Sequence, residues 1–330
     1  MEFYNKKYND YNLQNKHLFK KKTGNAKQYY QLVFDDTLEN DLKVLSKLYK
    51  SDMLFKIFGL HTNLYITENG YDGLFVDISN KNSNIHFDEK EKTFTVTSNT
   101  TVGDFVKFSM TKGYDFSALT GIPGQVGSGV VGNSSWTPTP SGKGFSDFVK
   151  KITVYDFEND EMSTITPNSE FFSERNSFIK QQNRIKTRYF VKEVVLQSDF
   201  TGESDVREKY NAQMEKREKQ LKFGFQEGTA GSLWSNAHLR KALDKSFSNM
   251  LKENPSIIAN FNGATYSPNG SQFFTTESNT TDKDVAQLFI HTLNKVKELY
   301  NFELHKEVII LDRDGEIDLT TFIERNKEEV

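Results

Sequence analysis

Gly121-Ile122-Pro123-Gly124-Gln125-Val126-Gly127-Ser128-Gly129 is the stretch that says most about the fold, and it runs directly into Val130-Val131-Gly132-Asn133. Because glycine carries no side chain beyond hydrogen, the exposed hydrogen-bonding groups of such a stretch are largely backbone amides. Successive backbone amides bind anions, phosphate groups above all. The stretch therefore predicts a phosphate-binding loop, although a glycine-rich turn by itself is also a common structural connection.

Length and composition exclude several classes of protein. The chain has 330 residues and can bury a core large enough for two or three lobes. Its 42 basic and 45 acidic residues give a formal net charge of -3, so it lacks the overall basic field of a nucleic-acid-binding or membrane-binding protein. It has no cysteine, which excludes disulfides, thiolate metal ligands and a cysteine nucleophile.

The N-terminal residues and the length of the apolar runs predict the cellular location of the protein. Residues 1–10 are polar and aromatic, unlike a secretory signal, and no apolar run approaches the roughly 20 residues that span a bilayer. We therefore expect a cytoplasmic protein that does not enter a membrane.

Apolar periodicity predicts a mixture of helices and strands. Val102, Phe105, Val106 and Met110 share one face of a helix over 101–113. An amphipathic helix is predicted over 282–300 with Thr281 as its N-cap, and a charged linking helix over 204–221. Strands are predicted over 55–58, 74–78, 94–97, 151–157, 190–197 and 307–311.

Further segments accompany the glycine-rich stretch in a fixed order. They are Gly59-Leu60-His61-Thr62-Asn63 with Gly70-Tyr71-Asp72-Gly73-Leu74, Arg175-Asn176-Ser177, Ala230-Gly231-Ser232-Leu233-Trp234-Ser235-Asn236, and Lys306-Glu307-Val308. Together with the glycine-rich stretch they resemble five signatures of the UDP-N-acetylenolpyruvoylglucosamine reductase family, also called UDP-N-acetylmuramate dehydrogenases or MurB. The resemblance runs from about Phe19 to Gly315. Each signature alone is weak, but five in order are specific.

The resemblance implies an α/β (α+β) fold. A two-part FAD-binding domain of the PCMH/vanillyl-alcohol-oxidase type would occupy residues 1–200, with subdomains at about 1–80 and 81–200. A C-terminal α+β substrate-binding lobe would occupy residues 201–330. A Rossmann fold is not expected, because Gly-x-Gly-x-x-Gly and its later acidic residue are missing. The residues that the resemblance assigns to FAD are Gly59, His61, Thr62, Asn63, Gly121, Ile122, Pro123, Gly124, Val126, Gly127, Gly129 and Asn133.

The resemblance also implies a reaction. It is the NADPH-dependent reduction of UDP-N-acetylglucosamine enolpyruvate to UDP-N-acetylmuramate, a step in peptidoglycan precursor synthesis, in a monomer. Ser232 would be the proton donor, and Arg175 and Glu307 would stabilise the charge that builds on the substrate carboxylate. Asn236 would contact the nucleotide sugar. No metal is expected, because the histidines, among them His17, show no ligand spacing.

The chain departs from the family pattern at several positions. Leu60 and His61 replace glycines, Glu174 replaces a tyrosine, Ser235 a lysine and Ile309 an arginine. These changes leave two alternatives open: a divergent FAD-dependent oxidoreductase with another substrate, and a flavin-binding protein without turnover. His61 could tether FAD covalently, as histidines of this loop do in the wider superfamily, or it could be a hydrogen-bonded turn residue.

Overall fold

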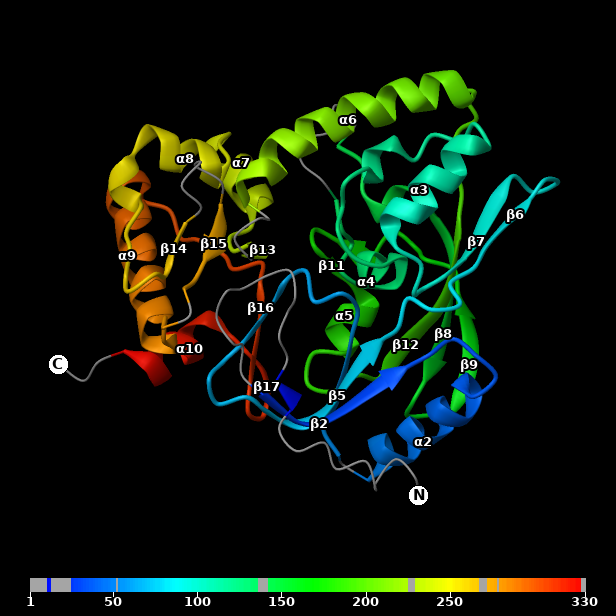
Figure 1. The fold of residues 1–330 in the computed structure, drawn as a ribbon, viewed down its shortest axis with the longest axis horizontal. Coiled ribbons are helices and arrows are strands. Elements are labelled where there is room, and N and C mark those ends of the chain that lie inside the picture. The colour runs from blue at the N-terminus through cyan, green and yellow to red at the C-terminus, as the bar shows by residue number, and fades with distance from the viewer. Residues whose placement is uncertain are drawn as a thin grey trace. The chain divides into compact units, whose positions relative to one another are not determined.

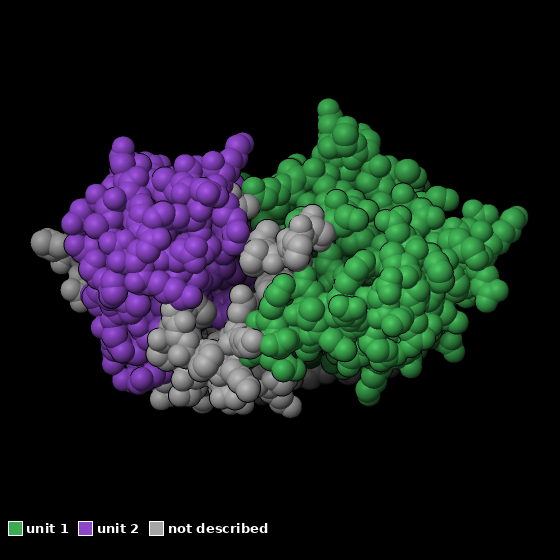
Figure 2. Space-filling view, turned by 90° about the horizontal axis from the view of Figure 1, so that it is seen from above, with its two compact units in different colours: residues 1–8, 28–60, 73–218 green, residues 9–27, 61–72, 219–330 purple. Residues whose placement is uncertain are grey.

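The computed structural model describes residues 11–12, 25–51, 53–135, 142–224, 229–266, 272–277 and 279–327. His17, and Phe19 at the start of the resemblance, lie outside these residues. The chain forms two compact units (Figure 2): residues 1–8, 28–60 and 73–218 make the first, and residues 9–27, 61–72 and 219–330 the second.

These units divide the chain differently from the predicted boundary between residues 200 and 201. Most of helix α6 (Glu203–Gly224) belongs to the first unit, where Lys209 forms a 2.6 Å ion pair with Asp115. Residues 61–72 belong to the second unit, because β4 (Leu64–Ile66) pairs in parallel with β16 (Ile309–Asp312). The assignment of an FAD-binding and a substrate-binding domain to parts of the chain stays a prediction.

A five-stranded antiparallel sheet organises the first unit. Its strands follow the order β6-β7-β12-β8-β9 and are β6 (Ile85–Asp88), β7 (Thr93–Thr97), β12 (Tyr189–Leu196), β8 (Val149–Asp156) and β9 (Glu161–Ile165). Helices α3 (Val102–Thr111), α4 (Val126–Val131) and α5 (Phe178–Gln182) belong to the same unit (Figure 1), with short 3-10 turns at Ser117–Leu119 and Phe145–Asp147.

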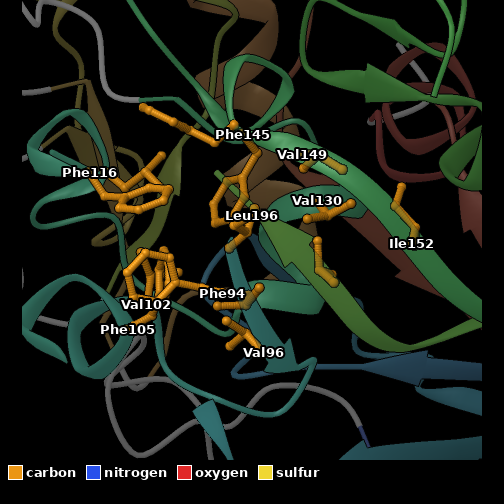
Figure 3. Close-up of a cluster of buried hydrophobic side chains, with 14 of the residues drawn as sticks. Phe94, Val96, Val102, Phe105, Phe116, Val130, Phe145, Val149, Ile152 and Leu196 are labelled. Atoms are coloured by element: carbon orange, nitrogen blue, oxygen red, sulfur yellow. The ribbon is translucent and has the colours of Figure 1, made fainter. Parts of the chain in front are cut away.

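The core of the first unit is rich in aromatic rings (Figure 3). Phe94 of β7, Phe105 of α3 and Phe116 are fully buried, with ring centroids 4.7 to 5.9 Å apart. Edge-to-face contacts at such distances add to the free energy that the rings gain by leaving water. The sheet, α3 and α4 are therefore held together around one apolar cluster.

A second sheet follows the order β1-β2-β5-β3, with β1 (Tyr11–Asn12), β2 (Asn25–Leu32), β5 (Tyr71–Ile78) and β3 (Phe55–Phe58). Strands β3 and β5 are parallel. Helix α2 (Leu38–Lys50) adds Leu42 and Leu45 to a smaller core that also contains Phe55.

The described residues of the second unit form two small sheets, four helices and the end of α6. One sheet has the order β17-β16-β4, with β17 (Gly315–Ile317), and the other the order β13-β15-β14, with β13 (Thr229–Ser232), β15 (Phe273–Thr275) and β14 (Thr265–Tyr266). The helices are α7 (Asn236–Leu243), α8 (Phe247–Glu253), α9 (Asp282–Tyr300) and α10 (Leu319–Asn326), with a 3-10 turn at Pro255–Ile257. Trp234 and Phe289 lie in its core.

The predicted mixture of helices and strands is confirmed. Helix α3 begins after Thr101, whose side chain accepts a hydrogen bond from the amide of Asp104, and Gly113 with a φ of 78° follows its end. Helix α9 begins after Thr281, as predicted. Among the described residues, no helix is both long and apolar enough to cross a membrane.

Candidate functional site

The second half of the glycine-rich stretch is a short helix, α4. Its first amides already have acceptors: Val126 donates to the carbonyl of Thr100 (2.8 Å) and Gly127 to that of Ser98 (2.9 Å). The amide of Gly129 donates to Gln125 (2.9 Å). These three predicted cofactor residues therefore fix the shape of the stretch through their own hydrogen bonds.

The first half of the stretch offers two amides with no such acceptor. Gly121 and Gly124 have φ values of 74° and 107°, which glycine adopts without strain. No oxygen of the described residues accepts a hydrogen bond from either amide, and Gly124 is buried. Ile122 instead donates to Leu119, and Pro123 has no amide hydrogen and is exposed. Gly121 and Gly124 are thus the residues of this loop best suited to an anionic ligand.

A buried arginine lies against the same loop. Arg217 of α6 is only 7% exposed, and its Nε donates to the carbonyl of Gly121 (2.8 Å). A Cβ at position 121 would lie 2.6 Å from Cγ of Arg217, so only glycine fits there. Burial, together with the nearby positive charge of Arg175, lowers the pKa of Arg217 to about 10. The guanidinium is still charged at neutral pH, and it places a positive charge beside the loop.

Arg217 was not among the residues predicted from the sequence. It lies in a helix dense with charged residues, where arginine is usually exposed. The absence of side chains at Gly121 and Gly124 was the only signal that something large could pack against the loop.

Arg175 lies in the turn of a hairpin in the first unit. Strands β10 (Phe172–Ser173) and β11 (Asn176–Ser177) pair, and Arg175 between them has a φ of 54°, which side-chain-bearing residues seldom adopt. Its Nη1 donates to the carbonyl of Ser135 (2.7 Å).

The hairpin is anchored to the end of α4. Asn133 Nδ2 donates to the carbonyl of Ser173 (2.9 Å), and Oγ of Ser177 donates to the carbonyl of Val131 (2.7 Å). Asn133, a predicted cofactor residue, thus connects the glycine-rich stretch to the Arg175 hairpin.

Gly59 of the first loop packs against the start of α4. A Cβ at this position would lie 2.7 Å from Oε1 of Gln125 and 3.2 Å from Oγ of Ser128. In the first unit, Gly59 and the Arg175 hairpin therefore both contact α4, which is the second half of the glycine-rich stretch.

The rest of the first loop belongs to the second unit. His61 has a φ of 54°, so it adopts the left-handed conformation although it replaces a family glycine. No oxygen of the described residues accepts from the amides of Thr62 and Asn63. Asn63 Nδ2 donates to the carbonyl of Glu307 (3.4 Å), and the carbonyl of Asn63 accepts from Ile309 (3.1 Å).

Ser232 and Glu307 are neighbours in the second unit. The amide of Glu307 donates to the carbonyl of Leu233 (2.8 Å), and the amide of Ser235 donates to the carbonyl of His305 (2.8 Å). The segments 233–235 and 305–307 therefore run side by side, and both Ser232 and Glu307 are half-buried. A Cβ at Gly231 would lie 2.9 Å from the carbonyl oxygen of Thr62, so this glycine lets the first loop approach Ser232 closely.

A glutamine that sequence reasoning missed contacts Ser232. Nε2 of Gln272 donates to Oγ of Ser232 at 2.5 Å, and the Gln272 side chain is 9% exposed. The two residues are 40 positions apart, and the pairing of Ser232 with Phe273 brings them together.

Asn236, the predicted substrate residue, has a structural contact. Its Oδ1 accepts from the amide of Phe247 (2.8 Å) and so joins α7 to the start of α8. Its neighbour Ser235 contacts Nδ1 of His238 through Oγ (3.2 Å). The contact of Asn236 with a nucleotide sugar stays a prediction.

Comparison with known proteins finds a matching domain model and similar reductases. Residues 35–165 match the family model of the FAD binding domain. UDP-N-acetylenolpyruvoylglucosamine reductase of Petrotoga mobilis is 27% identical over 283 residues, 84% of this chain and 86% of that protein. The enzyme of the same name from Rickettsia conorii is 25% identical over 301 residues, 91% of this chain and 93% of that protein. The chain is thus similar to reductases of this name over most of its length.

A solved structure agrees on the fold. UDP-N-acetylenolpyruvylglucosamine reductase (MurB) from Thermus caldophilus superimposes with a TM-score of 0.65 at 16% sequence identity, covering 90% of this chain and 97% of that one. The predicted α+β fold with an FAD-binding domain is confirmed. The match to the FAD binding domain contains Gly59 and the whole glycine-rich stretch, but it ends before Arg175, Ser232 and Glu307. The roles of those three residues stay predictions.

Proposed function

We propose that the chain is an FAD-dependent reductase that converts UDP-N-acetylglucosamine enolpyruvate to UDP-N-acetylmuramate at the expense of NADPH. Similarity to two reductases of that name, over 84% and 91% of the chain, supports this activity. The observation that carries the proposal is the 2.8 Å hydrogen bond from the amide of Glu307 to the carbonyl of Leu233, because it holds the segments that contain Glu307 and Ser232 next to each other. A monomeric state and a cytoplasmic location form part of the proposal.

The residues present fit FAD. In the first unit, the amides of Gly121 and Gly124 have no acceptor among the described residues, and Arg217 supplies a charge beside Gly121. Amides and one buried guanidinium suit the two negative charges of a pyrophosphate. When bound in its reduced form, FAD would supply the hydride.

Ser232 would act as the general acid. Reduction of the enolpyruvyl double bond adds hydride to the terminal carbon, and the α-carbon then needs a proton. Oγ of Ser232 accepts a hydrogen bond from Gln272, so the hydroxyl hydrogen can be given to the substrate. Ser232 is half-buried, which limits competition from water.

Glu307 and Arg175 would stabilise the substrate carboxylate, on which negative charge builds during reduction. Glu307 can do so in its protonated form, by donating a hydrogen bond to the carboxylate. Its backbone is fixed on both sides, by Leu233 and by Asn63. The assignment of Arg175, in the first unit, rests on the family resemblance.

The two half-reactions separate these roles. In an anaerobic stopped-flow experiment, Ser232→Ala should be reduced by NADPH as fast as the native protein. Its reoxidation by UDP-N-acetylglucosamine enolpyruvate should be about 100- to 10,000-fold slower, the usual contribution of a general acid. Ser163→Ala, a serine on the exposed strand β9, is the matched control and should behave like the native protein. Native-like reoxidation of Ser232→Ala would contradict the proposed role.

A second candidate is a reductase of the same chemistry with another acceptor. Two observations favour this candidate. The side chain of Asn236 accepts a hydrogen bond from the amide of Phe247, and Ser235 and Ile309 replace two cationic residues of the family pattern. Reoxidation by an acceptor without the nucleotide would identify this alternative.

A further inference from the structure

The contact between Gln272 and Ser232 is fixed by the sheet of the second unit. Ser232, the last residue of β13, pairs with Phe273, the first residue of β15, and Gln272 directly precedes it. The side-chain amide of Gln272 approaches Oγ of Ser232 to 2.5 Å. Because Gln272 is only 9% exposed, water has little access to this hydrogen bond.

The direction of this hydrogen bond has a chemical consequence. A serine hydroxyl has one hydrogen and two lone pairs, whereas an amide nitrogen can only donate. Oγ of Ser232 is therefore the acceptor, and its own hydrogen stays available for another group. The other end of the amide, Oε1 of Gln272, is buried without a hydrogen-bond partner among the described residues.

We propose that Gln272 is a positioning residue for proton transfer: its amide directs the hydroxyl hydrogen of Ser232 away from itself and stabilises the charge that Oγ acquires when that proton leaves. This inference rests on the proposed function. In the step, the O–H bond of Ser232 breaks and a C–H bond forms at the α-carbon of the substrate, while the O–H electron pair stays on Oγ. NADPH provides the hydride through FAD, and Oγ recovers a proton from water. An amide donor aimed at a developing oxyanion resembles one donor of an oxyanion hole.

Three variants test the role in reoxidation by UDP-N-acetylglucosamine enolpyruvate. Gln272→Leu removes the donor at similar size and should slow reoxidation about 100-fold, the usual effect of losing one oxyanion donor, with reduction by NADPH unchanged. Gln272→Glu should be slow at neutral pH, because a carboxylate only accepts, and should recover as the pH falls and the carboxyl becomes protonated. Thr276→Val is the matched control, since it removes a buried hydroxyl near the end of the same strand.

A double-mutant cycle excludes a merely structural effect. In the Ser232→Ala background, Gln272→Leu should cause no further slowing, because the group that it serves is gone. Equal slowing in both backgrounds would overturn the inference, as would a Gln272→Glu variant that is native-like at neutral pH. In that last case the serine would donate to residue 272 instead.

A measurement without turnover tests the hydrogen bond itself. In the native protein, the side-chain amide protons of Gln272 should include one NMR signal shifted by a short hydrogen bond, and Ser232→Ala should remove that shift. An unchanged signal would contradict the contact. If the native protein is never reoxidised by this acceptor, the proposed function fails and the proton-transfer role fails with it. If the native protein reacts but Gln272→Leu is equally fast, only the role of Gln272 fails.

Discussion

The replacement of Gly127 by alanine tests how the glycine-rich stretch is built. Gly127 lies in the first turn of α4, and a Cβ on it would meet Cβ of Ser98 at 2.5 Å and the carbonyl oxygen of Ser98 at 3.1 Å. One of these atoms is a backbone oxygen and the other is a Cβ atom, so neither can move away by a change of side-chain rotamer. The methyl group must push α4 away from the end of β7, and this also strains the 2.9 Å hydrogen bond from Gly127 to Ser98.

The free energy of unfolding should fall by about 2 kcal/mol. Overpacking of a rigid core costs about 1–3 kcal/mol, and loss of a hydrogen bond about 1 kcal/mol. The higher helix propensity of alanine over glycine raises the free energy of unfolding by at most about 1 kcal/mol. For a domain of about 150–250 residues, the net loss corresponds to a Tm lower by about 4–8 °C.

Thermal unfolding followed by circular dichroism measures this change. The matched control is Gly103→Ala in α3, where a Cβ would have no neighbour within 4 Å. This variant should gain about 0.5–1 kcal/mol and melt a few degrees above the native protein. A Gly127→Ala variant as stable as Gly103→Ala would refute the close approach of α4 to β7.

Three further substitutions test other parts of the fold. Phe94→Ala should lower the free energy of unfolding by about 3–5 kcal/mol in urea denaturation, because Phe94 is fully buried among aromatic rings; a loss below 1 kcal/mol would contradict that packing. Thr281→Ala should cost about 1 kcal/mol in the same assay, because the side chain of Thr281 accepts from the amide of Asp284 (3.3 Å) at the start of α9; no change would mean that this cap contributes nothing. Burial raises the pKa of Asp156, but hydrogen bonds, first from Arg188, outweigh it and leave the pKa below its usual value. This carboxylate therefore stabilises the protein above about pH 4, and its contribution is lost as the pH falls through the lowered pKa. Asp156→Asn should melt lower at pH 7 while the gap to the native protein narrows toward pH 3; a gap that is constant with pH would argue against the ion pair.

The amphipathic helices could be predicted from the sequence. In α3 and α9 the apolar spacing, a threonine N-cap and an aspartate three residues later all point to the same start. Strands β3, β7 and β12 were predicted close to their observed bounds because each is a short run rich in aromatic and β-branched residues.

Helix α4 could not be predicted. Glycine disfavours a helix, and Val126–Val131 contains two glycines. The helix exists because those glycines allow close packing, Gly127 against Ser98 and Gly129 against the ring of Phe145, where a Cβ would lie 2.4 Å away. The sequence shows the absence of a side chain but not the neighbour that requires it.

The candidate site was predicted in part. Ser232 and Glu307 were singled out by the family resemblance, and in the second unit the segments that contain them run side by side, while their roles stay predictions. Gln272 and Arg217 were missed because each reaches its contact from a distant part of the chain, Gln272 through strand pairing and Arg217 through the docking of α6. Such long-range contacts leave no periodic signal in a single sequence.

The central claim is the acceptor of the hydride. The most direct measurement reduces the purified FAD-loaded protein with NADPH under anaerobic conditions, adds UDP-N-acetylglucosamine enolpyruvate, follows the flavin absorbance and identifies the product by mass spectrometry. Reoxidation should be rapid and should form one UDP-N-acetylmuramate for each flavin. A flavin that stays reduced in the presence of this acceptor, or a protein that cannot bind FAD at all, would contradict it.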